Sequence, residues 1–246
     1  QARAQDRAAA RFPQLTAGGV WLASGRMAVD GYQHLFKICL VGDSGVGKST
    51  MMDRFLGREV HAKYVCTIGL DFGNTWRVVE GRVCKLQLWD TAGQERFRVA
   101  WRGMYRHFQG LLLVFDITDK ESFDSVRFWM RDIVEHAPGG VCTVLVGNQA
   151  DRVAERAVSR EEGQAMADWL GVRYVETSAT SEAAVEGAFL TAVRELLRQH
   201  EVASSIARTQ SERRLGGPAP GGARWMCGLR FLRSCFGLRG PKRCLG

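Results

Sequence analysis

A glycine-rich octapeptide follows directly on a short apolar run near residue 40. The run covers 35–41, and the octapeptide at 42–49 reads Gly-Asp-Ser-Gly-Val-Gly-Lys-Ser. An apolar run of this length is typical of a buried parallel strand, and the octapeptide matches the phosphate-binding pattern G-x-x-x-x-G-K-[ST], which lies between a strand and a helix. We therefore expect an α/β fold that binds a ligand at the carboxyl end of this strand.

The residue types in this loop suit phosphate and a metal ion. Glycines let backbone N–H groups turn inward around phosphate oxygens, and the N-terminus of the following helix adds partial positive charge. Lys48 places a cation against the β and γ oxygens, and Ser49 offers a hydroxyl ligand to Mg²⁺. The alternative, a glycine-rich turn with a chance Lys-Ser pair, is disfavoured by the flanking strand and helix patterns. The candidate nucleotide-binding residues here are Ser44, Gly45, Val46, Gly47, Lys48, Ser49 and Thr50.

Strand and helix patterns alternate along the rest of the body. Two runs, 74–79 and 83–89, are separated by Glu80 and Gly81, which is a hairpin signal. Further apolar runs predict strands, and segments with helical periodicity lie between them. This alternation indicates an open, mostly parallel α/β sheet. The further strands are expected at 110–116, 141–147 and 172–176, and the helices at about 121–135, 159–170 and 182–200.

The residues at 90–95, Asp-Thr-Ala-Gly-Gln-Glu, stand at the end of a predicted strand. There an acidic group can reach a metal ion through its water shell, and the N–H of a flexible glycine can meet a γ-phosphate. Together with the segments 68–72, 85–96 and 112–118, this motif resembles the Rab-type small GTPases of the Ras superfamily over about residues 33–200. The resemblance implies the G domain of P-loop NTPases, a six-stranded, mostly parallel sheet flanked by helices. It also implies a slow, activator-dependent hydrolysis of GTP to GDP and phosphate.

The resemblance assigns roles to individual residues. Thr67 would bind Mg²⁺ together with Ser49, and Asp90 would lie beside them. Gly93 would contact the γ-phosphate, and Gln94 would orient the attacking water as the catalytic residue. The implied cofactors are Mg²⁺ and GTP or GDP. Effectors, an exchange factor and a GTPase-activating protein would bind two switch loops. These loops lie at 58–72 and 91–107, and the residues that would read the guanine are Asn148, Gln149, Asp151, Ser178, Ala179 and Thr180.

Three departures from the family pattern concern the surroundings of the base. The Asn-Lys-x-Asp motif reads Asn-Gln-Ala-Asp here, so Gln149 replaces a lysine whose stem covers the purine face. Thr180 replaces the lysine of Ser-Ala-Lys, and Val60 stands where an aromatic residue packs on the base edge. Each lost contact costs about 1 kcal/mol or more, which is the scale of buried apolar and stacking groups. We expect weakened base contacts and fast nucleotide exchange, with the phosphate and metal elements intact.

Charge divides the chain into a slightly acidic body and two basic ends. Residues 203–246 hold nine Lys and Arg against one acidic residue, and 1–26 hold four Arg against one. The body keeps a small net negative charge, which argues against nucleic-acid binding. We expect a small GTPase domain over 33–202 and a basic tail over 203–246. For 1–32 we expect a disordered extension, although an Arg-rich, acid-poor leader also resembles an organelle transit peptide.

The basic tail predicts membrane attachment without a membrane span, since no run of about 18 apolar residues occurs. Apolar residues recur at helical spacing between arginines over 224–239, which favours an amphipathic segment on an anionic leaflet; a disordered tail is the alternative. Cys244 is third from the end, whereas a C-a-a-X prenylation signal needs a cysteine fourth from the end. We expect the cytoplasmic face of an intracellular membrane, with cycling to the cytosol. The lipidation candidates are Cys227, Cys235 and Cys244.

Two functions fit this sequence. The first is a GTP-controlled switch that recruits effectors in vesicle trafficking, and Thr67 and Gln94 favour it. The second is a nucleotide-binding adaptor of the same fold with little or no regulated hydrolysis, which Val60, Gln149 and Thr180 favour.

The seven cysteines form no C-x-x-C pair or zinc-site spacing, which is typical of reduced thiols in the cytosol.

Overall fold

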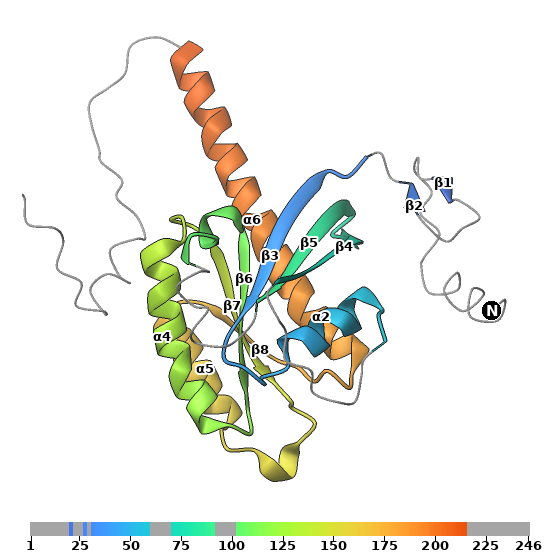
Figure 1. The fold of residues 1–246 in the computed structure, drawn as a ribbon. Coiled ribbons are helices and arrows are strands. Elements are labelled where there is room, and N and C mark those ends of the chain that lie inside the picture. The colour runs from blue at the N-terminus through green and yellow to red at the C-terminus, as the bar shows by residue number, and fades with distance from the viewer. Residues whose placement is uncertain (1–19, 22–26, 29–30, 60–69, 92–101, 216–246) are drawn as a thin grey trace, which may run out of the picture.

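The computed structural model describes residues 20–21, 27–28, 31–59, 70–91 and 102–215. Within these ranges a six-stranded sheet is flanked by four helices, and a separate pair of short strands precedes it (Figure 1). The sheet strands are β3 (His34–Val41), β4 (Leu70–Val79), β5 (Arg82–Thr91), β6 (Gly110–Asp116), β7 (Cys142–Asn148) and β8 (Arg173–Glu176). The other elements are β1 (Val20–Trp21), β2 (Met27–Ala28), α2 (Lys48–Leu56), α4 (Lys120–His136), α5 (Arg160–Leu170), α6 (Glu182–Leu215) and the 3-10 turns η1 (Tyr105–His107) and η2 (Val153–Glu155).

The strands of the sheet follow the order β4-β5-β3-β6-β7-β8. All neighbours run parallel except β4 and β5, which form an antiparallel hairpin. The direction of winding changes at β3, because β5 pairs with one of its edges and β6 with the other. In open α/β sheets the ligand binds at such a switch point, beyond the carboxyl ends of the strands. The predicted six-stranded, mostly parallel sheet is confirmed.

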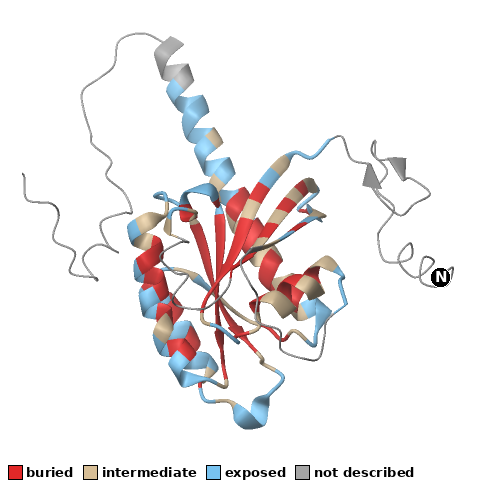
Figure 2. Cartoon of the chain, viewed as in Figure 1, coloured by how far each residue is buried: buried red, intermediate tan, exposed pale blue. Residues whose placement is uncertain are grey.

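Helices cover both faces of the sheet, and the central strands β6 and β7 are buried along their whole length (Figure 2). α2 and α6 pack on one face, and α4 and α5 pack on the other. Alternate residues of β3 divide between the two cores: Ile38 and Leu40 join the first, and Cys39 and Val41 join the second. Because both faces are covered, this strand reads as a continuous apolar run and not as an alternating one.

The β4–β5 hairpin turns at Glu80 and Gly81, as the sequence predicts. Both residues have positive φ, +52° and +76°. Two-residue turns of this kind match the right-handed twist of the strands that they join. The hairpin places β4 at the edge of the sheet and β5 beside β3, so that β5 ends next to the loop after β3.

The structure differs from the sequence-based expectations at three places along the chain. β4 begins at Leu70, before the expected start at residue 74. α6 continues past its expected end near residue 200 and enters the segment expected as tail, because residues 201–215 contain no Gly or Pro and Gly216, Gly217 and Pro218 follow. Within the expected disordered extension, β1 and β2 pair as antiparallel strands. Among the described residues, no helix combines the length and hydropathy needed to span a bilayer.

Candidate nucleotide-binding site

The loop at 42–47 leaves β3 and enters α2 at the switch point of the sheet. Its backbone is left-handed at Gly45 and Gly47, with φ of +85° and +91°. A Cβ atom on Gly47 would lie 2.3 Å from Nδ2 of Asn148, and one on Gly42 would lie 2.1 Å from the carbonyl oxygen of Val114. The loop therefore needs glycine both for its curvature and because β6 and β7 approach it closely.

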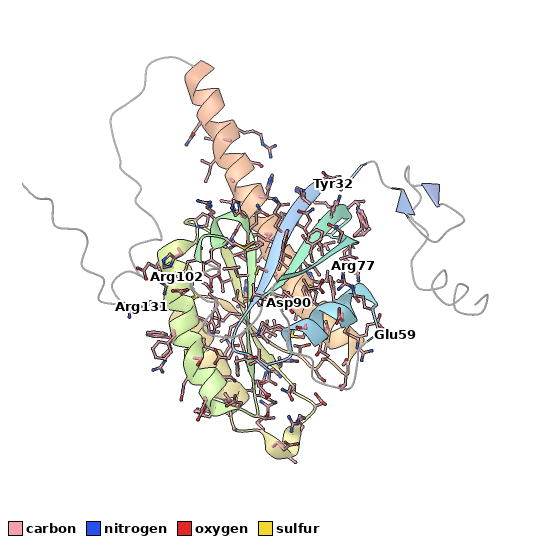
Figure 3. All side chains as sticks on the ribbon, in the orientation of Figure 1. Tyr32, Glu59, Arg77, Asp90, Arg102 and Arg131 are labelled. Atoms are coloured by element: carbon pink, nitrogen blue, oxygen red, sulfur yellow. The ribbon has the colours of Figure 1, made fainter. Side chains whose placement is uncertain are left out.

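Lys48 and Ser49, the first residues of α2, fix this loop and connect it to β5. Nζ of the buried Lys48 donates to the carbonyl oxygens of Gly42 at 3.0 Å and Asp43 at 2.6 Å. Oγ of Ser49 donates a hydrogen bond to Oδ2 of Asp90, which is buried near the end of β5. Figure 3 labels Asp90 near the centre of the domain. The lysine predicted to bind phosphate, the serine predicted to bind Mg²⁺ and the predicted acidic residue therefore lie close together.

This arrangement fits a phosphate chain and a divalent cation. The N-terminus of α2 and the Lys48 ammonium gather positive potential at one point. The Ser49 hydroxyl and the Asp90 carboxylate are hard oxygen donors of the kind that Mg²⁺ binds directly or through water. Burial raises the pKa of the neighbouring Cys39 thiol, and the charge of Asp90 raises it further, so the thiol stays neutral and adds no anion.

The loops that follow β7 and β8 meet beside the phosphate-binding loop. The N–H of Ala150 donates to the carbonyl of Thr177 at 3.0 Å, and the N–H of Thr177 donates to the carbonyl of Gly147 at 2.8 Å. The buried Asn148 uses Nδ2 to donate to the carbonyl of Val46 at 2.8 Å. This last bond connects the predicted base-binding loops directly to the predicted phosphate-binding loop.

Asp151, Ser178 and Thr180 form a short chain of hydrogen bonds. The Ser178 hydroxyl donates to Oδ1 of Asp151 and lies 2.6 Å from Oγ1 of Thr180, whose N–H also donates to it at 3.1 Å. Next to them, the carbonyl of Ala179 accepts a bond from Nε of Arg54 at 2.9 Å, which connects this loop to α2. The structure thus brings together the predicted guanine-reading residues of both loops.

Gln149 is held by protein groups at both ends of its side-chain amide. Nε2 donates to Oδ2 of Asp116 at the end of β6, and Oε1 accepts a bond from Nη1 of Arg152 at 2.8 Å. The backbone φ of Gln149 is +64°, which is uncommon for a residue other than glycine. Gln149 stands where the family pattern has a lysine that covers the purine face, and here its amide connects β6 to the loop after β7.

An ion pair also connects the same two loops. Arg156 donates from Nη1 and Nη2 to the two carboxylate oxygens of Glu176, at 2.8 and 3.0 Å. This bidentate bond keeps the pKa of Glu176 below its ordinary value, although partial burial opposes the shift. Glu176 ends β8 and Arg156 follows η2, so the pair fixes the segment after Asp151 against the strand that leads to Ser178.

Sequence reasoning missed several of these supporting residues. Trp129 of α4 donates from Nε1 to Oδ1 of Asp43 in the phosphate-binding loop at 2.7 Å. Like Arg54 and Arg156, it belongs to no motif, and the sequence carries no local signal for such partners. Other predicted residues lie outside the described residues, so their roles stay predictions. These are Val60, Thr67, Gly93, Gln94, Cys227, Cys235 and Cys244.

Comparison with known proteins gives one consistent result. The model of the Ras family matches residues 37–198. The GTP-binding protein ypt2 of Schizosaccharomyces pombe is 45% identical over 173 residues, which cover 70% of this chain and 86% of the relative. The GTP-binding protein yptV2 of Volvox carteri is 47% identical over 69% of this chain and 79% of its own. The human Ras-related protein Rab-8B is 44% identical over 68% of this chain and 80% of its own.

Proposed function

Because this chain belongs to the Ras family and is a Rab-like small GTPase that hydrolyses GTP, we propose that it acts as a guanine-nucleotide switch in vesicle trafficking. One observation carries the proposal: the phosphate-binding loop, Asp90 and the two base loops converge at the switch point of the sheet. The bond from Asn148 to Val46 joins the phosphate half of this site to the base half.

In the phosphate half, Lys48 and the N-terminus of α2 hold the β- and γ-phosphates. Ser49 and Thr67 would hold Mg²⁺, and Asp90, which accepts the hydrogen bond of Ser49, would add its carboxylate beside them. Mg²⁺, when bound, neutralises the charge that develops on the transferred phosphoryl group. Gln94 orients the attacking water, since this reaction depends on positioning and not on covalent chemistry.

In the base half, Asn148, Asp151, Ser178 and Ala179 select guanine. An ionised carboxylate is an acceptor only, so Asp151 suits the two adjacent N–H donors of guanine. At the matching positions adenine offers the acceptor N1 and a C2–H group, so the carboxylate would have no donor to accept from. The chain would therefore bind GTP and GDP in preference to adenine nucleotides.

The base half holds its ligand weakly, and this gives the switch fast nucleotide exchange. The amide of Gln149 is engaged by Asp116 and Arg152, and the Thr180 hydroxyl is engaged by Ser178. Neither residue offers the long cationic stem that lysine has at these positions in the family pattern. Affinity differences between related sites appear mainly in the off-rate. With GTP in excess over GDP in the cell, such a protein rests largely in its GTP form.

The switch loops and the basic tail suggest two kinds of partner. Effectors, exchange factors and GTPase-activating proteins bind the switch loops at 58–72 and 91–107. The basic tail, with one or more of its three cysteines lipidated, attaches the protein to the cytoplasmic face of an intracellular membrane. A lipid chain together with a polybasic patch supplies the two signals that stable anchoring needs.

The catalytic assignment is tested by single-turnover GTP hydrolysis. Gln94→Leu should slow hydrolysis at least about tenfold, because the water loses its orienting amide. Gln164→Leu is the matched control, since Gln164 is an exposed glutamine on α5 that bonds only locally to Asp168. Hydrolysis by the Gln94 variant at the unmodified rate contradicts the assignment. An unmodified protein that binds GTP without hydrolysing it, with or without an activating protein, supports the adaptor alternative.

A further inference from the structure

The hydroxyl of Ser178 has a complete set of hydrogen-bond partners. A serine hydroxyl provides one donor and two acceptor sites. The Thr180 N–H lies 3.1 Å from Oγ of Ser178, and Oγ1 of Thr180 lies 2.6 Å away. The third partner is Oδ1 of Asp151. Three contacts for three sites leave no spare capacity on this oxygen.

The direction of each bond follows from chemistry. An ionised carboxylate cannot donate, so Ser178 must give its single proton to Asp151. The contact between the two hydroxyls then has Thr180 as its donor and Ser178 as its acceptor. The chain therefore runs in one direction, from the Thr180 hydroxyl through the Ser178 hydroxyl to the Asp151 carboxylate.

We propose that Thr180 is a positioning residue for guanine selection, which acts through Ser178 to hold Asp151 in the orientation that accepts two N–H bonds. The inference rests on the proposed function of this site. Asp151 is exposed and its loop leads into η2, so its carboxylate needs a fixed partner to keep one rotamer. Ser178 is buried and provides that partner only while its own proton points at Asp151.

Thr180 controls where the Ser178 proton points. Without the Thr180 hydroxyl, Ser178 keeps one N–H donor, and its proton is freer to turn toward water or a backbone carbonyl. Asp151 then samples other rotamers. The hydrogen bond from the second N–H donor of guanine weakens first, because two bonds form together only while both carboxylate oxygens are in place. Hydrogen bonds that polarise one another in sequence make this loss larger than the exposure of Thr180 suggests.

The measurement compares GDP with IDP, whose base lacks the exocyclic amino group. Dissociation constants are obtained by displacement of fluorescent GDP from the full chain in excess Mg²⁺, and the readout is the ratio of the IDP constant to the GDP constant. Thr180→Val removes the hydroxyl at nearly constant shape, and Thr180→Ala removes it with less bulk. Thr180→Ser restores the hydroxyl. Thr209→Val is the matched control, because Thr209 is an exposed threonine whose hydroxyl bonds locally within α6.

The proposal predicts that Thr180→Val and Thr180→Ala lower this ratio about fivefold or more, the scale of one net hydrogen bond. Thr180→Ser and Thr209→Val should keep the ratio within about twofold of the unmodified protein, a change of less than half a kcal/mol. A merely structural role would weaken GDP and IDP equally and leave the ratio unchanged, and that result overturns the proposal. If the unmodified protein does not distinguish the two nucleotides, the guanine-selective function itself fails. A selective protein with an unchanged ratio in the variants removes only the role of Thr180.

Discussion

The side-chain amide of Gln149 donates a hydrogen bond to the carboxylate of Asp116, the last residue of β6. The other carboxylate oxygen of Asp116 accepts bonds from the N–H and the hydroxyl of Thr118, at 2.7 and 2.6 Å. Asp116 is buried, so these protein donors replace the water that the carboxylate would otherwise bind. The pair fixes the loop after β7 to the segment that leads into α4.

Removing the carboxylate should therefore cost more stability than removing the amide. Asp116→Ala leaves three donors without their acceptor, so we expect a loss of about 2 kcal/mol in the free energy of unfolding. Gln149→Ala should cost less than about 1 kcal/mol, because that side chain is only half-buried. Urea denaturation at a fixed nucleotide concentration measures both changes. Equal losses for the two variants would contradict this account of the pair.

A histidine pair near the start of β3 should make stability depend on pH. The ring of His34 stacks on Phe36 at 5.6 Å and meets the ring of His200 on α6 edge-on at 5.1 Å. Burial lowers the pKa of His34 below 6.5, and the charges of His200 and Arg82 lower it further, against an opposite effect of Glu201. The unfolded chain then binds the proton more tightly than the folded one. This contribution to stability is complete above pH 6.5 and is lost as the pH falls through the lowered pKa.

The free energy of unfolding should thus decrease between about pH 7 and pH 5, and His34→Gln should reduce the slope. His107→Gln is the matched control, since His107 is exposed and far from α6 in the chain. Denaturation midpoints measured over this range give the result. A His34 variant with the full slope of the unmodified protein would exclude this histidine as the cause.

The tail should carry membrane attachment by charge and lipid together. α6 continues as a helix to Leu215 beyond the body of the domain (Figure 1), and all but one of its residues 201–210 are exposed. Deleting residues 224–246 should release the protein from membranes and leave nucleotide binding unchanged, because the site lies entirely on the domain. Replacing Cys227, Cys235 and Cys244 by Ser separates the lipid from the charge, and mass analysis identifies any lipidated cysteine. A truncated protein that stays membrane-bound at moderate salt would refute the assignment.

The sequence predicted most of the sheet because its strands are local patterns. The apolar runs near β3, β6 and β7 are bounded by Gly or polar residues, and buried parallel strands have this form. The end of α6 was missed because its apolar periodicity fades near residue 200 while helix-forming residues continue. Burial explains periodicity, but helical propensity and the absence of Gly or Pro decide how far an exposed helix continues.

In the candidate site too, residues of local motifs were predicted and contacts between distant parts of the chain were not. Lys48, Ser49, Asp90 and Asn148 were predicted because each belongs to a motif with fixed spacing. The contacts from Trp129 to Asp43 and from Arg54 to Ala179 join residues 86 and 125 positions apart, which no local pattern records. The partner of Gln149 was missed for the same reason: a departure from a motif shows which contact is lost, and the fold determines which contact replaces it.

The most direct test of weak base binding is the rate at which fluorescent GDP leaves the unmodified protein in millimolar Mg²⁺. We predict release within minutes, with slower release in Gln149→Lys and slower still when Val60→Phe is added. Each tenfold change in rate corresponds to about 1.4 kcal/mol, so the loss of one base contact is readily measured. The account would be contradicted by GDP release over hours from the unmodified protein. It would also be contradicted if both variants release GDP at the rate of the unmodified protein.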